Sequence, residues 1–374
     1  MALGRKFPGF ARLPRQPLLR HLLVALLGGI VLYFYSSSVG QFSDFQLAEI
    51  GAYAIVLVGL TVLIGLNGQV SLGHGAFMAI GGYSAALVLK HQQFPLVVVF
   101  LIAIGVSAFV GGIFGIAAAR LRGPYLAGIT LSLAIALPEV FVHFESVFKG
   151  EQGIIVNPLA PPAWAGPTFT PERWLAWISL FAALIIMVLV ANLMRGRFGR
   201  AFRAVRDDEI AASVAGIHVA KTQILAFVVS AACAGLGGSL LALGNGLVSP
   251  AGYSLLLSLS LLTGVVVGGL GSIVGAIWGA IILVYLNQWV TDAAKSLHFS
   301  PTAGANMSNA AYGVLLILVM ILFPEGIQGG LRRLGHIVKG DGPQAAKQPK
   351  PARLLDALTG RSSISKQPQG VIDP

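Results

Sequence analysis

Four polar side chains inside an apolar stretch are the residues of this chain best suited to bind a small solute. Asn67, Gln69, Ser71 and His74 lie in GLNGQVSLGHGAFMAIGGY, residues 65–83, between long apolar runs. A polar group without a partner is costly in hydrocarbon, so we expect these side chains to face a cavity or another helix. The interspersed glycines permit an unwound helix with exposed backbone groups. Broken helices of this kind form small-molecule sites in transporters.

The alternative for this stretch is a turn between two helices, with His74 hydrogen-bonded to neighbouring backbone. Glu139 is a separate candidate, preceded by Pro138 and followed by His143 toward the end of an apolar run. Its carboxylate could meet a substrate ammonium group or line an aqueous vestibule. It could equally lie at the membrane interface with its head in water.

Signatures of enzymes are missing from the sequence. The seven histidines show no metal-ligand spacing such as H-x3-H, and no G-x-S-x-G motif is present. Lys221-Thr222 resembles the end of a phosphate-binding loop, but Ala220 stands where that loop requires glycine. We therefore expect no catalytic residue, no metal site, no bound cofactor and no ATP hydrolysis by this chain itself.

The segment 195–221, RGRFGRAFRAVRDDEIAASVAGIHVAK, is unusually charged for this sequence. Arginines and apolar residues both recur in it at helical spacing: Arg197, Arg200, Arg203 and Arg206, and Phe198, Phe202 and Val205. On a helix this spacing places an apolar stripe beside a basic one. It predicts a surface helix that docks on a cytoplasmic partner; the alternative is that the basic stripe contacts lipid phosphates.

A second short helix is predicted directly after the first. Asp207 or Asp208 can cap its N-terminus, and the helix then runs through Ile210 and Ala211. Gly216 can close it in the left-handed conformation that glycine enters freely.

Composition places the chain in a membrane. Of its 374 residues 56% are hydrophobic and only 10% are charged, with a mean hydropathy of +0.81, whereas soluble domains carry about 25% charged residues. The sequence predicts an all-α, polytopic bundle of about ten membrane helices, with eight or nine as alternatives because the run 254–290 could form one helix or two. The expected spans are 20–36, 48–66, 70–90, 95–119, 124–144, 174–194, 222–243, 254–270, 272–290 and 310–324.

The basic residues predict the orientation of these spans. Of the 25 lysines and arginines, only Lys90, Lys149, Arg173 and Lys295 fall on one side of the ten-span arrangement. The positive-inside rule then places both termini and the segment 195–221 in the cytoplasm. The net charge of +11 is therefore a topology signal, and we expect no nucleic-acid partner.

Three regions follow from these patterns. They are a basic cytoplasmic arm, 1–19; a membrane domain, 20–324, which contains the segment 195–221; and a polar tail, 325–374, expected to be disordered and cytoplasmic. The proline-rich loop 145–173 is expected to have little regular structure.

Glycines at helical spacing predict close contacts between helices. The pairs are Gly264 with Gly268, Gly111 with Gly115, and the series Gly271, Gly275 and Gly279. In lipid, such small-xxx-small patterns let helix backbones approach each other. Helix packing is a more economical explanation of these glycines than contact with substrate.

Four stretches of the chain carry more specific motifs: LNGQVSLGHGAFMAIGGYSAAL (66–87), LRGPYLAGITLSLA (121–134), GRAFRAVRDDEIAASVAGIHVAKTQILAFVVSAACAGLGGSL (199–240) and VVVGGLGSIVGAIWGA (265–280). Together they resemble the membrane permeases of branched-chain amino-acid ABC importers. The Arg-Gly-x-Tyr element at Arg122, Gly123 and Tyr125 resembles the second of the two permease types in such systems.

The resemblance implies a subunit of a larger importer in the bacterial inner membrane. Its partners would be a second permease subunit, two cytoplasmic ATP-binding subunits that use the ATP, and an external solute-binding protein. Glu209, Ala211, Ala212 and Gly216 stand where the Glu-Ala-Ala…Gly element of the ATPase coupling segment is expected. By position, Arg200, Arg203, Arg206, Asp207 and Asp208 belong to the same coupling loop.

Departures from the family pattern leave the substrate open. Residues 149–154 stand where many relatives carry a Thr-Gly-Gly-rich segment, and the pattern around Pro138 and Glu139 is altered. Permeases for urea or short amides are therefore an alternative. A secondary transporter driven by an ion gradient is another, although few ionisable residues lie within the spans. A membrane-embedded enzyme or an inert anchor agrees less well with the same features.

Overall fold

The computed structural model describes residues 40–91, 94–121, 124–162, 166 and 169–296, with scattered positions between 307 and 330. The predicted arm 1–19, the span 20–36, the tail beyond Gly330, and Arg122 with Gly123 lie outside the described residues. Only isolated positions of the span 310–324 are described, so the total number of spans remains a prediction.

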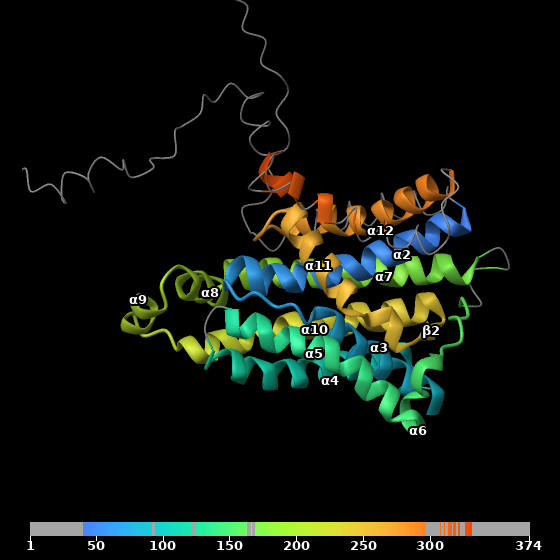
Figure 1. Ribbon diagram of the computed structural model, residues 1–374, viewed down its shortest axis with the longest axis horizontal. Coiled ribbons are helices and arrows are strands. Elements are labelled where there is room, and N and C mark those ends of the chain that lie inside the picture. Colours follow the sequence, from blue (N-terminus) through green and yellow to red (C-terminus); the bar gives the residue numbers. More distant parts are fainter. Residues whose placement is uncertain are drawn as a thin grey trace, which may run out of the picture. The chain divides into compact units, whose positions relative to one another are not determined.

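The described chain is helical almost throughout (Figure 1). Its longer helices are α2 (Gln41–Leu60), α3 (His74–His91), α4 (Leu96–Ala118), α5 (Pro124–His143), α7 (Pro171–Arg195), α8 (Arg197–Asp207), α10 (Val219–Asn245), α11 (Leu255–Gly268) and α12 (Ile273–Ser296). Shorter elements are the π-helix η1 (Thr61–Leu66), α6 (Glu145–Phe148), η2 (Gly150–Gln152), β1 (Ile154–Ile155), α9 (Glu209–Val214), β2 (Leu247–Val248) and η4 (Pro250–Tyr253).

Seven helical segments in the described residues are long and apolar enough to cross a membrane. Together with α3, they occupy eight of the ten predicted runs. The run 254–290 forms two helices, because the chain turns between Gly268 and Ile273 through Gly269 and Gly271, which both have positive φ. The prediction of a polytopic helical membrane protein with interrupted helices is confirmed.

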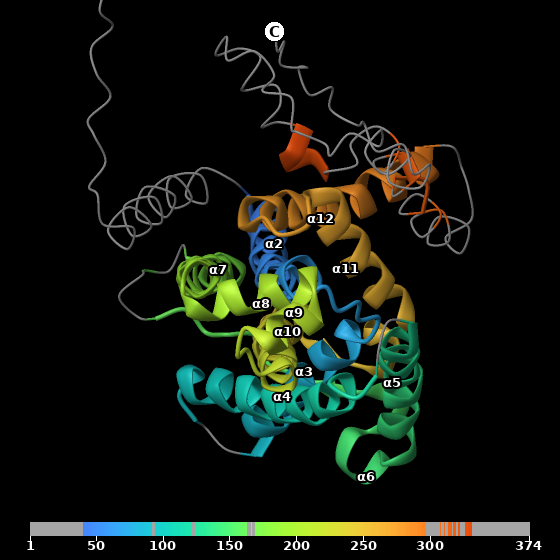
Figure 2. The ribbon, with the colours of Figure 1, turned by 90° about the vertical axis from the view of Figure 1, so that its left-hand side faces the viewer.

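Helix α10 lies at the centre of the bundle and packs against α4, α3 and α2 (Figure 2). The contacts are close because small residues meet there. A Cβ on Gly115 of α4 would lie 3.0 Å from the Cα of Ile224, and one on Gly59 of α2 would lie 2.6 Å from the Cβ of Cys233. These contacts confirm the predicted role of glycine in helix packing on α4 and extend it to α2.

Helices α11 and α12 form the second glycine contact. A Cβ on Gly268 would overlap the carbonyl of Gly275, and a Cβ on Gly279 would overlap the carbonyl of Gly264. Gly271, predicted to belong to the same helical series, lies instead in the turn between the helices, with a φ of +80°. Its spacing suited a helix, but α11 already ends at Gly268, and the positive φ of Gly271 belongs to the turn that follows.

The loop 145–173 was predicted to have little regular structure, and that prediction is wrong for its first part. This part forms α6, η2 and β1, and β1 pairs antiparallel with β2, Ile154 opposite Val248 and Ile155 opposite Leu247. Gly153, with a φ of +71°, fits against the backbone of Val248 where a side chain would clash. The pairing was missed because the partner strand is far away in sequence.

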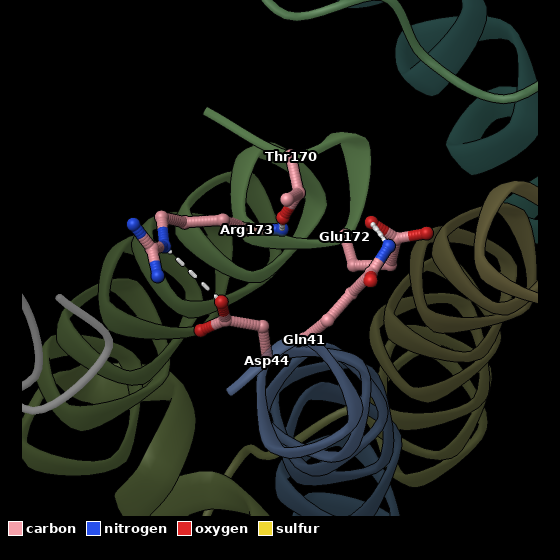
Figure 3. A network of polar contacts seen from close by, with 5 residues as sticks. All are labelled: Gln41, Asp44, Thr170, Glu172 and Arg173. Carbon is pink, nitrogen blue, oxygen red and sulfur yellow. Dashed lines mark hydrogen bonds and ion pairs between the residues drawn. The ribbon is translucent and has the colours of Figure 1, made fainter. Parts of the chain in front are cut away.

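A polar network joins the first turns of α2 and α7 (Figure 3). Nε of Arg173 lies 3.1 Å from a carboxylate oxygen of Asp44, which is fully buried, and Gln41 donates to Glu172 at 2.9 Å. Thr170 caps α7 by accepting from the backbone of Arg173. Because both contacts join first turns, α2 and α7 run parallel. The first turn of α7 lies at the end of that helix opposite α8, which follows its C-terminus (Figure 1).

Replacing Gly268 by alanine is expected to destabilise the protein, because the new Cβ would overlap the carbonyl of Gly275. Overpacking of this kind costs about 1–3 kcal/mol. The matched control is Gly105→Ala in α4, since a Cβ there meets nothing within 4 Å. Thermal unfolding of the purified variants in detergent measures the difference. Equal unfolding temperatures for the two variants would contradict the close α11–α12 contact.

Candidate functional site

The polar stretch predicted to interrupt a helix does so. The chain leaves α2 through the π-helix η1, which ends at Leu66, and is helical again only from His74. The amide of Asn67 donates to the carbonyl of Val62 at 3.1 Å, five residues earlier, which is π-helical bonding. Gly68 then turns the chain with a φ of +74°. Residues 67–73 are therefore not helical, and because they connect two helices they also agree with the alternative of a turn between helices.

All four predicted polar residues of the stretch are buried, each less than a tenth exposed. Asn67 donates to the side chain of Gln69 at 2.8 Å. The His74 ring nitrogens lie 3.1 Å from the Ser71 hydroxyl and 2.7 Å from the Ser230 hydroxyl of α10. The histidine therefore joins the start of α3 to α10. Its partners are hydroxyl groups, whereas the alternative of a simple turn predicted neighbouring backbone.

Hydroxyl groups from two other helices supply partners for the interrupted backbone. The amide of Leu72 donates to Thr130 of α5 at 3.0 Å, and that of Gly75 donates to Ser258 of α11 at 3.0 Å. Sequence reasoning missed these residues, together with Ser230. The available signal was a hydroxyl residue inside an apolar span, since such side chains re-satisfy the backbone of broken membrane helices.

Asn67 retains one oxygen atom without a partner. Its Oδ1 is buried and accepts no hydrogen bond from the described part of the chain. Glu139 does not join this network, because it lies on an exposed face of α5. The structure thus brings together four of the five predicted pathway residues and leaves the fifth apart.

Helix α8 forms as predicted, but its buried face is rotated from the expected one. Phe202 and Val205 are buried, and so is Gly199, which fits against the end of α7 at Met194. Phe198, expected in the same stripe, is 39% exposed. The Arg197 guanidinium packs over its ring, 4.8 Å from the ring centre. Because Gly199 lets α8 approach Met194 closely, it takes the buried position that we assigned to Phe198.

The arginines of α8 bind backbone carbonyls of their own chain. Arg203 donates to Met194 at 3.2 Å, and Arg206 donates to Gly65 at 2.8 Å. Arg200 makes a longer contact, 3.5 Å, with the carbonyl of Arg195. The predicted basic stripe is therefore not simply a free positive surface for a partner.

Helix α9 is closed at both ends as predicted. Asp208, and not Asp207, is the N-cap: its carboxylate accepts from the amides of Ile210 and Ala211 at 2.8 and 3.0 Å. At the other end the amides of Gly216 and Ile217 donate to Ser213 and Ala212, and Gly216 has a φ of +84°. This pattern is a Schellman motif, which fixes the direction in which the chain leaves the helix.

Two predicted coupling residues fasten α9 to the bundle. Glu209 accepts from Gln223 of α10 at 2.9 Å, and Ala212 is buried. The outer face carries Ile210 and Val214, which are 73% and 85% exposed, beside the exposed Ala211. We had treated Ile210 only as part of the helix. The signal for an apolar face was the spacing of four residues between the two side chains.

Comparison with known proteins gives consistent matches. The family described as the permease component of branched-chain amino acid transport systems matches residues 44–323. The high-affinity branched-chain amino acid transport system permease protein LivM of Escherichia coli is 30% identical, over 82% of this chain and 74% of its own length. LivM of Salmonella typhimurium is also 30% identical, over 74% and 67% of the two chains. LivH of Salmonella typhimurium is 29% identical, over 74% and 91%. No solved structure gives a significant match.

Removing the cap of α9 is expected to loosen the helix. Asp208→Ala deletes the acceptor for two amides and costs about 1 kcal/mol, so the amides of Ile210 and Ala211 should exchange about fivefold faster. Asp208→Asn keeps an acceptor oxygen and serves as the matched control. Hydrogen–deuterium exchange with mass spectrometry measures both variants. Native protection in Asp208→Ala would contradict the capping role.

Proposed function

The chain belongs to the family of permease components of branched-chain amino acid transport systems, and from this premise we propose that its α8–α9 segment docks on an ATP-binding subunit. As a permease component of an ABC transport system it is not an enzyme, and it works with other subunits. The α8–α9 segment, Arg197–Val214, is continuous with α7 and leads directly to α10. A force on it would therefore act on two membrane helices at once.

The exposed apolar pair on α9 supports docking. Ile210 and Val214 lie on a helix fixed by a cap, a Schellman motif and the Glu209–Gln223 bond. Burying an apolar side chain of this size in a partner is worth about 1.5–3 kcal/mol. Figure 1 shows α9 at the end of the bundle, away from α6 and β2. A rigid apolar projection of this kind suits an apolar recess on a soluble subunit.

The remaining assignments follow from the charge distribution and the family. The α8–α9 segment and both termini are cytoplasmic, and the membrane is the bacterial inner membrane. The partners are a second permease subunit, two ATP-binding subunits and an external solute-binding protein. This chain binds no cofactor, and its partners hydrolyse the ATP.

The translocation pathway runs beside the interrupted stretch 67–73. Asn67, Gln69 and Ser71 lie there, with His74 directly after it, and the Oδ1 of Asn67 accepts no hydrogen bond from the residues that the structure describes. Glu139 would contribute a carboxylate from α5. The substrates are branched-chain or related amino acids, whose ammonium groups suit acceptors of this type.

The experiment that tests this proposal is purification of the tagged chain from its native membrane in mild detergent, with mass spectrometry of the co-purifying proteins. The expected result is an ATP-binding subunit and a second permease subunit in stable ratio. Recovery of the chain alone, in a preparation that still transports, would overturn the proposal.

Polar substitutions on α9 are expected to weaken binding of the ATP-binding subunit. Ile210→Ser and Val214→Ser remove exposed apolar contacts, and each should raise the dissociation constant about tenfold. The matched control is Ile155→Ser, since Ile155 is 77% exposed and lies in β1, away from α9. Binding to the purified permease in nanodiscs measures the effect. If Ile155→Ser weakened binding as much as Ile210→Ser, the docking surface would lie elsewhere.

A further inference from the structure

Arg206 occupies a notch where the α8–α9 segment meets the interrupted helix. One guanidinium nitrogen donates to the carbonyl of Gly65 at 2.8 Å, and the other two lie 2.9 and 3.0 Å from a carboxylate oxygen of Asp207. Gly65 is in η1, so the bond joins two elements far apart in sequence. A bond from a charged donor is about twice as strong as a neutral one.

The notch exists because Gly68 has no side chain. A Cβ on Gly68 would come within 2.7 Å of Cγ of Arg206, and the backbone of Gly68 has a φ of +74°. The arginine stem therefore lies against Gly68 while its head reaches Gly65. Gly65 and Gly68 thus together bind the side chain of Arg206 from the α8–α9 segment.

Gly65 also touches a third element. A Cβ on Gly65 would overlap the backbone of Gly271, which lies in the turn between α11 and α12. The carbonyl that Arg206 holds is therefore part of a backbone contact between η1 and that turn. Gly65 lies in the last turn of η1, where carbonyls lack continuing helical partners.

From these contacts we infer that Arg206 is the positioning residue that transmits movement of the α8–α9 segment to the interrupted helix and to the α11–α12 turn. The inference rests on the proposed function, because movement of the segment must come from an ATP-binding subunit. It differs from docking, since the contact that matters is the bond to Gly65 within this chain, although the Arg206 side chain itself is 41% exposed. When the segment moves, the Arg206 bond moves Gly65, and the polar stretch that follows moves with it.

The test uses the complete complex in proteoliposomes, with transport and ATP hydrolysis measured together. Arg206→Gln should still assemble and hydrolyse ATP, but transport per ATP should fall by about tenfold, the equivalent of one charge-assisted hydrogen bond. Arg206→Lys keeps a charged donor for Gly65 and should restore most of the coupling. The matched control is Lys221→Gln, which removes the same charge from an exposed site outside the notch.

A distance measurement tests the link without changing Arg206. Spin labels at Arg197 of α8 and Val70 of the interrupted stretch, both exposed, report whether the two elements move together. The single native cysteine, Cys233, is buried and is replaced by alanine. The distance should stay constant through the nucleotide cycle in the labelled protein with Arg206, and should become broad and nucleotide-dependent in Arg206→Gln.

The outcomes separate this inference from the proposed function. If the complex with Arg206 intact does not assemble, the proposed function fails. If the complex assembles and Arg206→Gln transports normally per ATP, the role of Arg206 in transmitting movement is overturned and docking stands. The same holds if the Arg197–Val70 distance changes with nucleotide while Arg206 is present. If Arg206→Gln is present in the membrane but no longer assembles, Arg206 is a docking residue. This outcome would also overturn its role in transmitting movement.

Discussion

A chain that leaves its helical conformation must find new partners for the freed backbone groups, and the arrangement around residues 67–73 follows from this requirement. Buried backbone groups need hydrogen-bond partners, so side chains replace the missing helical bonds. In this chain Thr130 and Ser258 bind amides of Leu72 and Gly75, and Arg206 binds the carbonyl of Gly65. The interruption is thereby connected to α5, α11 and α8. A local departure from helical structure becomes a junction between several parts of the bundle.

Close backbone contacts set the positions of the helices that supply those partners. Gly268 and Gly275 bring α11 onto α12, and small residues bring α10 onto α4 and α2. Contacts of this kind leave little room for side chains to adjust, so each helix pair behaves as a unit. Under the proposed docking, a displacement of α8 would reach these helices through α10, which α8 contacts. This mechanical property suits a subunit driven by another subunit's ATP hydrolysis.

The sequence predicted the helices and their apolar faces better than it predicted which residues contact each other. Apolar runs located eight of the helices. The cap of α9, predicted at Asp207 or Asp208, and its closure at Gly216 were also predictable, since these effects depend only on local sequence. The contact of Arg206 with Gly65 and the exposure of Phe198 could not be predicted from the sequence, because each depends on packing against η1 or α7. The β1–β2 pairing, the hydroxyl partners of the interruption and the Asp44–Arg173 ion pair are long-range contacts as well. The periodicity of a helix shows which of its faces is apolar, but it does not show which residues of other elements contact that face.

The measurement that tests the central claim most directly is uptake of radiolabelled leucine by the reconstituted complex with its solute-binding protein, with ATP enclosed and no ion gradient imposed. An ATP-coupled permease predicts uptake that requires hydrolysable ATP, stops with a non-hydrolysable analogue and is indifferent to a protonophore. Uptake that continues without ATP and collapses when a protonophore is added would contradict the account and identify an ion-coupled transporter.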